Sequence, residues 1–527
     1  MFAAIHSATV VGVDAIPVMV EVDISAGLPQ VQLVGLPDGA VREARVRVKS
    51  AIENAGFMFS AGRVCVNLAP ADIRKDGTLF DLPIALALLA ADGVIREREL
   101  ALARGYLIAG ELSLEGQLRP VRGVLPLTLC ARAQGLRGVI VPWENAEEAA
   151  LVVDAEVVAC RTLEDALEFL RGEGSARVMA APREVASVMR VSESAVDFAE
   201  VRGQAAARRA LEIAAAGGHN VMMSGPPGAG KTMLARRFPT ILPQMTFDEA
   251  LETTRVWSVS GMTRGQAAMQ TERTFRAPHH TISEVGMVGG GSGLPRPGEV
   301  SLAHNGVLFL DELPEFRRSV LEVLRQPLED GVIAVTRSLV TVEYPARVML
   351  IASMNPCPCG YYGDARQSCR CSPHDVQRYR GRISGPLMDR VDIHLEVPSV
   401  SYDALRDRST NESSAAMRGR VEKARAIQRA RFAGTKVYAN AQMGARELSA
   451  FCELDGAGHA LLRQAMEAFG MSARAWARIL KVARTIADLA GSESIGRVHV
   501  AEAIQLRSMD RALGASRGDA LARSHAP

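Results

Sequence analysis

Hydrophobic and polar positions change their period along the chain and divide it into regions. Residues 1–170 alternate short apolar runs with amphipathic segments of helical period. This alternation predicts an α/β domain. The predicted strands lie at residues 8–13, 18–22, 63–68, 106–110 and 138–142, and the predicted helices at residues 40–54, 82–91, 125–134 and 145–152. Residues 171–196 lose both periods, which favours a linker.

The second region, residues 197–398, holds apolar runs that each end in polar side chains. Such runs are typical of the buried strands of a parallel sheet. Residues 399–513 are almost wholly helical in pattern, with long Arg-rich amphipathic segments, and residues 514–527 form a polar, flexible tail. We therefore predict a mixed α/β chain in which a parallel-sheet domain precedes a helical domain.

The first apolar run of this second region breaks into a glycine-rich turn that ends in Lys and Thr. The turn matches the pattern G-x-x-x-x-G-K-[ST], whose glycines let backbone N–H groups approach phosphate oxygens. We expect Lys231 to reach the outer phosphates of ATP and Thr232 to offer its hydroxyl to Mg²⁺. The predicted nucleotide-binding residues are Gly225, Pro226, Pro227, Gly228, Ala229, Gly230, Lys231 and Thr232. The alternative is a glycine-rich turn without a ligand.

Two later apolar runs end in side chains that suit hydrolysis. Asp311 and Glu312 follow one run, and Asn355 follows the next. We expect Asp311 to hold Mg²⁺ and Glu312 to orient and deprotonate the attacking water. The amide of Asn355 is a candidate to contact the terminal phosphate or that water. An Asn after a strand is often only a turn residue, so its assignment depends on the other motifs.

Four of the eight cysteines crowd into residues 357–371. They are Cys357, Cys359, Cys369 and Cys371. Side chains at positions i and i+2 of an extended segment point the same way, so C-x-C-x₉-C-x-C spacing permits a tetrahedral Zn²⁺ site. Free thiols or a redox-labile pair are the alternatives.

The phosphate loop, the strand ending in Asp311 and Glu312, and Asn355 together resemble Walker A, Walker B and sensor 1 of AAA+ ATPases. Residues 275–280 (FRAPHH), 297–306 (PGEVSLAHNG) and 355–360 (NPCPCG) are similar to the magnesium-chelatase-like branch of that class. Within that branch the chain resembles the competence protein ComM/YifB family, from residue 1 to about residue 512.

This resemblance implies a homohexameric ring with a C-terminal helical lid. It implies that Arg390, in the segment GPLMDR, is the arginine finger given to the ATP of the neighbouring subunit. It also implies that Arg474, near the start of a helix, is sensor 2. For Arg474 a solvated helix charge is the alternative.

Residues 331–344 read as two alternating strands with a tip at Arg337 and Ser338. In ring motors of this branch such hairpins point into the central pore, so the resemblance implies that Arg337 contacts the DNA backbone. A structural hairpin with a chance arginine at its tip is the alternative.

The first domain resembles the Lon-protease fold in residues 70–77 (PADIRKDG) and 116–125 (GQLRPVRGVL). These parallel the segments that carry the Ser and Lys of that protease. Here no Ser follows Gly77, and the Lys position falls near Leu125. Without an activated nucleophile acyl chemistry is lost, so we predict a scaffold that organises the ring or grips DNA. Thr78 is the only hydroxyl left to support protease activity.

Composition and charge indicate the number of domains and the cellular location, but they do not decide the function. The 527 residues are 48% hydrophobic, which permits about three domains with ample core. A net charge of +2 neither requires nor excludes nucleic acid, so any basic surface must be local. Neither a signal peptide nor a long apolar span is visible, and we expect a cytoplasmic protein with no membrane association.

The function implied by the resemblance is an ATP-dependent hexameric DNA motor, a helicase that catalyses branch migration when incoming DNA recombines in natural transformation. A chelatase-type ATPase that remodels a protein partner for metal insertion is the second candidate. An ATP-dependent Lon-like protease is the third. The motor subunit of a chelatase generally lacks the long Lon-like domain, which favours DNA as the partner.

Overall fold

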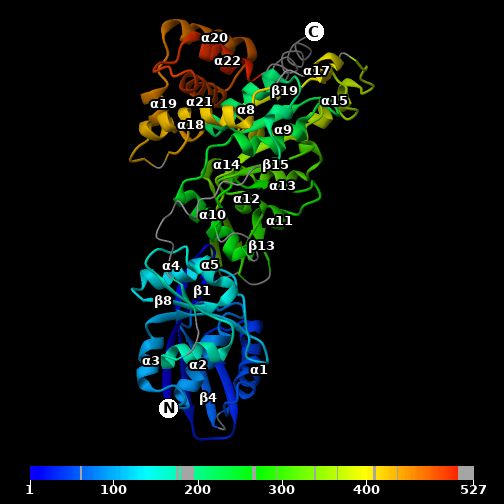
Figure 1. Cartoon of the computed structure of the whole chain (residues 1–527). Coiled ribbons are helices and arrows are strands. Elements are labelled where there is room, and N and C mark those ends of the chain that lie inside the picture. The colour runs from blue at the N-terminus through cyan, green and yellow to red at the C-terminus, as the bar shows by residue number, and fades with distance from the viewer. Residues whose placement is uncertain are drawn as a thin grey trace.

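The computed structural model arranges three groups of elements along one long axis (Figure 1). We call them the N-terminal module (residues 1–173 and 177–179), the central module (195–400) and the C-terminal helices (411–507). The structure describes residues 1–59, 62–173, 177–179, 195–263, 269–291, 294–337, 340–364, 366–406, 411–435 and 437–507. Of residues 177–179, Arg337, Val340 and Leu405 only the backbone is described.

The N-terminal module is built on two four-stranded sheets that share one apolar core with their helices. The first sheet has the order β1 (Phe2–Val11), β2 (Asp14–Ser25), β4 (Arg63–Ala69) and β3 (Gln30–Val34). The second has the order β10 (Arg177–Met179), β9 (Glu156–Cys160), β8 (Gly138–Pro142) and β5 (Tyr106–Ile108). The helices are α1 (Gly39–Asn54), α2 (Asp81–Ala91), α3 (Glu97–Ala103), α4 (Val124–Ala133), α5 (Ala146–Ala149) and α6 (Leu163–Arg171), and a short hairpin joins β6 (Glu111–Leu112) to β7 (Leu118–Arg119).

The predicted α/β alternation is confirmed, with differences at several boundaries. Strand β1 begins well before residue 8 and ends at Val11, before residue 13, and β2 extends past both ends of 18–22. Antiparallel pairing runs from Phe2 opposite Asp23 to Val11 opposite Asp14. The ladder satisfies backbone groups at polar positions too, so hydrophobicity underestimates its length. The helix predicted at residues 145–152 is only α5, one turn long. The predicted linker includes β10, which pairs antiparallel with β9.

The central module contains one five-stranded parallel sheet. Its order is β12 (Phe275–Arg276), β15 (Val307–Leu310), β18 (Met349–Met354), β11 (Val221–Ser224) and β19 (Ile393–Glu396). The register pairs Leu310 with Ala352 and Ser224 with Met354, so the carboxyl ends of the three middle strands meet at one edge. In open parallel sheets this edge is where ligands bind.

The remaining elements of the central module surround this sheet and form two small hairpins. The helices are α8 (Ala205–Gly217), α9 (Lys231–Arg237), α10 (Phe247–Ser260), α11 (Glu284–Val288), α12 (Glu299–Leu302), α13 (Arg318–Glu322), α14 (Arg325–Asp330), α15 (Pro373–Arg380) and α16 (Gly385–Met388). The hairpins are β13 (Gly289–Gly290) with β14 (Arg296–Pro297), and β16 (Val332–Arg337) with β17 (Val340–Pro345). The latter confirms the hairpin predicted at residues 331–344.

The C-terminal helices pack on the central module through α8, which α18 and α21 both contact. They follow α17 (Tyr402–Arg406) and are α18 (Ser414–Arg431), α19 (Ala445–Phe451), α20 (Gly456–Phe469), α21 (Ala473–Leu489) and α22 (Arg497–Gln505). Within the described ranges no helix combines the length and apolarity needed to cross a bilayer.

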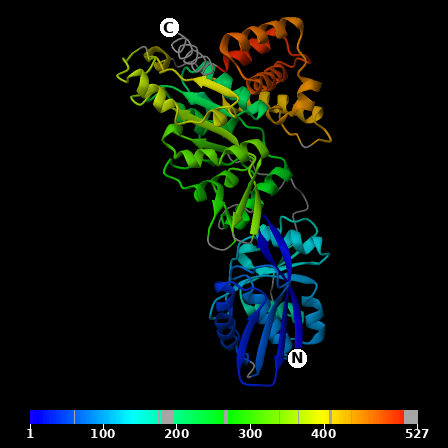
Figure 2. The ribbon, with the colours of Figure 1, turned by 180° about the vertical axis from the view of Figure 1, so that it is seen from behind.

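The N-terminal and central modules meet in a defined joint, where the β1–β2 hairpin reaches the central module (Figure 2). Gly12, at the hairpin turn, lies so close to β17 that a Cβ atom there would be 2.6 Å from Val342 Cγ1. Beside it, Glu148 of α5 accepts a hydrogen bond from the Ser258 hydroxyl of α10. An apolar cluster also crosses this joint, formed by Leu125, Leu151, Val152 and Ala155 from the N-terminal module and Met245, Ala250 and Met269 from the central module.

Candidate functional site

The glycine-rich turn joins β11 to α9 at the ligand-binding edge of the sheet. Gly228 and Gly230 have φ angles of +75° and +92°, a region that side chains disfavour. At Gly225 a Cβ atom would lie 2.1 Å from the carbonyl oxygen of Val397, so only glycine permits this approach. The sequence pattern therefore meets three separate backbone requirements of the turn.

Lys231 is buried at the start of α9, where its ammonium group lies over the turn. Its Nζ donates to the carbonyl oxygens of Gly225 and Pro226 at 2.6 and 3.0 Å, and to Asn355 Oδ1 at 3.1 Å. Burial lowers the pKa of Lys231, and the carboxylates of Asp311 and Glu312 oppose that shift. The structure thus brings Lys231 and Asn355 together from two neighbouring strands.

The carboxylate of Asp311 is oriented by several donors. Thr232 donates from its hydroxyl to Asp311 Oδ2 at 2.8 Å, and Ser353 donates to Oδ1. A hydroxyl and a carboxylate oxygen at this separation can share one Mg²⁺ shell, because Mg²⁺ prefers hard oxygen ligands. Thr232 and Asp311 are therefore the residues that could hold the metal.

Glu312 has a φ of +53°, in the left-handed region that non-glycine residues seldom occupy. Strain of this kind concentrates at functional sites. Its side chain is more than half exposed, and Oε2 lies 3.9 Å from His280 Nδ1. The ring of His280 stands 4.0 Å from that of His279. Glu312 is therefore free to face a ligand at the same edge where Asp311 is fixed.

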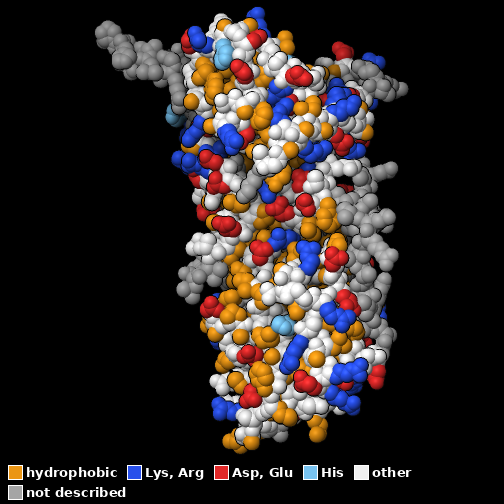
Figure 3. Space-filling view, turned by 90° about the vertical axis from the view of Figure 1, so that its left-hand side faces the viewer, with side chains coloured by type: hydrophobic (Ala, Val, Ile, Leu, Met, Phe, Trp, Pro, Cys, Tyr) orange, Lys and Arg blue, Asp and Glu red, His pale blue; other side chains and the backbone are white. Residues whose placement is uncertain are grey.

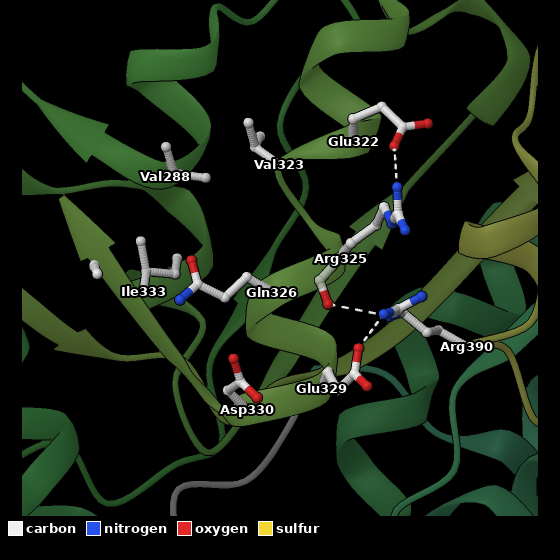
Figure 4. Close-up of a pocket in the computed structure, with 10 residues that line it drawn as sticks. Val288, Glu322, Val323, Arg325, Gln326, Glu329, Asp330, Ile333 and Arg390 are labelled. Carbon is white, nitrogen blue, oxygen red and sulfur yellow. Dashed lines mark hydrogen bonds and ion pairs between the residues drawn. The ribbon is translucent and has the colours of Figure 1, made fainter. Parts of the chain in front are cut away.

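The contacts of Arg390 and Arg474 lie in a different part of the structure from those of Lys231 and Asp311. Arg390 follows α16 and donates to the carbonyl oxygen of Arg325 at 3.1 Å and to the carboxylate of Glu329 (Figure 4). It also donates to the carbonyl oxygen of Pro386 at 2.8 Å. It lines a pocket of ≈ 470 Å³ with α14. Arg474 is 69% exposed, and its Nη1 lies 3.4 Å from Asp389 Oδ2. Because Asp389 directly precedes Arg390, this ion pair places the two arginines in the same region.

The four clustered cysteines lie in the loop between β18 and α15. Their Sγ atoms all lie within 4.8 Å of one another. Sγ of Cys357 is 3.4 Å from that of Cys359 and 3.6 Å from that of Cys369. Backbone N–H groups of Arg370 and Tyr361 lower the pKa of Cys359 to about 6. Four sulfurs at these separations fit tetrahedral Zn²⁺, whose Zn–S bonds of about 2.3 Å place sulfurs about 3.8 Å apart.

Arg337 ends β16 opposite Val340, as the predicted hairpin tip requires. Its side chain and the tip residues Ser338 and Leu339 lie outside the described residues. The contact of Arg337 with DNA therefore stays a prediction.

The positions that resemble the Lon dyad hold no comparable pair. The Thr78 hydroxyl donates to the Glu111 carboxylate, and the buried Lys75 ammonium donates to the Pro70 carbonyl oxygen. Leu125 is fully buried in the joint, and its backbone N–H donates to Glu148 Oε1 at 2.9 Å. Thr78 thus donates its proton to an acid, and among the described residues no lysine bonds its hydroxyl.

Sequence reasoning missed two residues of the central site. Ser353 completes the orientation of Asp311, and Gln204 donates from Nε2 to the carbonyl oxygens of Ala229 and Pro398 at 3.2 and 2.6 Å. Ser353 is detectable once β18 is placed beside β15, because in-register pairing brings it level with Asp311. Gln204 has no comparable signal, since its partners are distant backbone carbonyls.

Family models match three stretches of the chain. A model of magnesium chelatase subunit ChlI matches residues 197–405, a second model of this subunit matches residues 20–145, and a model of its C-terminal part matches residues 411–507. Together they cover most of the N-terminal module, the central module and the C-terminal helices.

Curated relatives align with the chain nearly end to end. Competence protein ComM of Haemophilus influenzae is 44% identical over 514 residues, covering 97% of this chain and 98% of that protein. The uncharacterized protein YifB of Salmonella typhimurium is 43% identical over 512 residues, covering 97% and 98%. Lon protease 2 of Bacillus subtilis is 24% identical over 150 residues, covering 27% and 26%.

Proposed function

The chain belongs to the ComM/YifB family of magnesium-chelatase-like AAA+ ATPases, and we propose that it is an ATP-driven hexameric DNA motor. Its work is branch migration when incoming DNA recombines in natural transformation, inside the cell. The observation that carries the proposal is the convergence of Lys231, Asp311 and Asn355 at one sheet edge, in a chain 44% identical to a competence protein.

Within each subunit the chemistry follows from the contacts of the site. Lys231 binds the outer phosphates of ATP. Thr232 and Asp311 would hold Mg²⁺, which would supply positive charge against the phosphates. Glu312 accepts a proton from the attacking water, because it directly follows Asp311 and its side chain is more than half exposed. Asn355, held by Lys231, orients the terminal phosphate or the water.

Arg390 completes the site of the neighbouring subunit. The bonds to Glu329 and to the Arg325 carbonyl oxygen hold it within its own chain (Figure 4). The bond to the Pro386 carbonyl oxygen adds to this restraint. Joining of two subunits exchanges these bonds for the phosphates of the neighbour's ATP. A positive charge delivered there stabilises the transferring phosphoryl group. Arg474 acts as sensor 2, and its ion pair with Asp389 couples α21 to the segment that carries Arg390.

The DNA contact is local. Basic and acidic side chains alternate along the face drawn in Figure 3, so attraction of DNA by a continuous basic patch is not supported on that face. The β16–β17 hairpin offers Arg337 at its end, and its base is fixed by buried Ile333, Val335 and Val342. A rigid base with a basic tip suits a lever that pushes a phosphate backbone.

We also assign Cys357, Cys359, Cys369 and Cys371 to one structural Zn²⁺ ion. The assignment is supported by the sulfur separations, which match a tetrahedral tetrathiolate site. Elemental analysis of protein washed with a weak chelator tests it, with about one zinc per chain expected. A ratio near zero contradicts it.

The test of the proposed function is the ATPase rate with forked or four-way DNA at increasing salt. We expect stimulation, unwinding, and a steep loss of both as salt rises, because backbone contacts release counterions. Lys231→Ala is the matched control and should abolish both activities. Full ATPase activity without stimulation by any DNA would contradict the DNA motor and leave the ATPase.

A second candidate is a chelatase-type ATPase that remodels a protein partner during metal insertion. The matching family models favour it, since all three describe a magnesium chelatase subunit. The same measurement separates the two, because a protein remodeller gains nothing from DNA. A Lon-like protease is disfavoured by the contacts of Thr78 and Leu125.

A further inference from the structure

The loop that carries the four cysteines, described for residues 356–364 and 366–372, lies directly against the phosphate loop. At Gly360 a Cβ atom would be 2.5 Å from Pro227 Cδ and 2.7 Å from Pro227 Cγ. Carbon atoms in contact are normally about 3.5–4.0 Å apart, so glycine is required here. Gly360 also has a φ of +88°. The residue next to Cys359 is thus pressed against a proline of the predicted nucleotide site.

Two arginines tie the same loop to its surroundings. Arg380 of α15 donates from Nε to the carbonyl oxygen of Pro356 at 3.1 Å, beside Asn355. Arg366 donates to the carbonyl oxygens of Ser399 and Val400 at 3.1 and 2.6 Å, where the chain leaves β19 toward the C-terminal helices. The loop therefore connects the phosphate loop, the residue next to Asn355, and the exit toward those helices.

Apolar burial contributes little to holding this loop in place. Cys357 is fully buried, but the described residues from Tyr361 to Ser372 are exposed or half-buried. Stabilisation by the hydrophobic effect scales with buried apolar area, so this part of the loop needs another restraint. The two ends of the loop meet at the four sulfurs, where Cys357 and Cys359 contact Cys369 at 3.6 Å each.

We infer that Zn²⁺ held by Cys357, Cys359, Cys369 and Cys371 stabilises the phosphate loop through the contact of Gly360 with Pro227. Nucleotide affinity then depends on a metal that contacts no phosphate. The metal closes the loop, the closed loop places Gly360 against Pro227, and Pro227 sets the path of the turn that holds the nucleotide. The inference rests on the ATP site and the zinc site proposed above. It adds a coupling between them that neither site requires on its own.

The first experiment measures zinc content and the Kd of a fluorescent ATP analogue on the same samples of full-length protein. We expect about one zinc per chain. We also expect about a tenfold higher Kd after the metal is stripped under reducing conditions, and recovery when Zn²⁺ is returned, since couplings between sites typically span about 5–150-fold. An unchanged Kd in zinc-free protein would overturn the inference, as would the absence of zinc from the wild type.

Two variants locate the coupling. Cys371→Ser should lose zinc and raise the Kd about tenfold, whereas Cys65→Ser, a free thiol in β4, should change neither. Gly360→Ala keeps all four cysteines and adds the atom that collides with Pro227. It should keep its zinc and still bind the analogue more weakly. Circular dichroism confirms that each variant is folded.

The outcomes separate the coupling from the sites it joins. If Gly360→Ala retains zinc and wild-type Kd, the path through Pro227 is wrong. If Cys371→Ser is folded, lacks zinc and binds the analogue normally, the metal has no hold on the nucleotide site and the inference fails. A zinc-loaded wild type that binds nucleotide no better than Lys231→Ala would instead refute the proposed ATP site.

Discussion

The N-terminal and central modules both layer helices on sheets, yet they differ in what the strand ends carry. In the central module Thr232 and Ser353 converge on one carboxylate, and Lys231 meets Asn355. In the N-terminal module, at the positions that resemble a protease dyad, Thr78 contacts an acid and Leu125 is buried in the joint between the modules. The central module thus gathers the side chains of a candidate ATP site, whereas the corresponding residues of the N-terminal module make structural contacts.

The difference teaches that a similar layering of helices on sheets does not by itself supply a site, because packing and catalysis depend on different residues. The core of the N-terminal module is intact, while Leu125 packs in one cluster with Ala250 of α10. Gly12 likewise touches Val342, on the hairpin that ends in Arg337. We therefore expect a change at this contact to alter the position of that hairpin.

The largest effect is expected from Arg390→Ala, which would remove the charge that we propose Arg390 offers to the neighbouring site. Hydrolysis should fall by about 10³–10⁵-fold with ATP binding preserved, as for arginine fingers in general. The measurement is steady-state ATPase beside nucleotide binding. Arg378→Ala changes an exposed side chain of α15 and is the control; it should keep the wild-type ATPase rate. Retained hydrolysis in Arg390→Ala would remove this residue from the mechanism.

Glu312→Gln should lower the ATPase rate by about 10²–10⁴-fold, the range for loss of a general base. Nucleotide binding should remain, because Asp311 and Lys231 are untouched. Thr78→Ala, in the N-terminal module, is the matched control for a polar residue without a catalytic role and should keep the wild-type rate. The contrast between modules breaks if casein is cleaved by wild type and spared by Thr78→Ala.

Arg337→Ala should leave basal hydrolysis intact and weaken DNA binding. Loss of one phosphate contact should reduce the slope of log affinity against log salt by about 1 per hairpin engaged. Fluorescence anisotropy at several salt concentrations measures this slope. An identical slope in wild type and variant would show that Arg337 touches no phosphate.

Gly12→Ala should destabilise the joint by about 1–3 kcal/mol, since the added carbon collides with Val342 Cγ1 and the φ of +68° disfavours a side chain. Gly135→Ala is the matched control, because Gly135 has a φ of +71° with open space around it. Thermal unfolding gives the difference between the two variants. Stimulation of the ATPase rate by DNA should fall in Gly12→Ala and not in Gly135→Ala. Equal stimulation in the two variants would show that the joint has no role in the response to DNA.

The smallest effect concerns pH. Burial raises the pKa of Glu148 above its ordinary value near 4.5, so the folded protein favours the protonated acid. Stability from this residue is therefore full below pH 4.5 and is lost as the pH rises through the raised pKa. The thermal midpoint of wild type relative to Glu148→Gln should fall over that range. A constant difference would mean that Glu148 does not titrate in the joint.

Local patterns predicted more of the molecule than long-range contacts did. The glycine turn, the run before Asp311 and the strands at residues 63–68 and 138–142 were predictable, because each depends on neighbours in sequence. The bond from Ser353 to Asp311 depends on strand order, and the contact of Gly12 with Val342 on how two modules dock. The partner of Arg390, Glu329, lies 61 residues away. No short pattern encodes such pairs.

The most direct test of the central claim, a site shared by two subunits, is to mix two inactive variants. Lys231→Ala cannot bind phosphate but offers Arg390, and Arg390→Ala binds ATP but offers no finger. If subunits mix at random in equal amounts, about a quarter of the sites pair an intact loop with an intact finger, and hydrolysis should return to about that fraction of the wild-type rate. A mixture that stays as inactive as either variant alone would contradict the account.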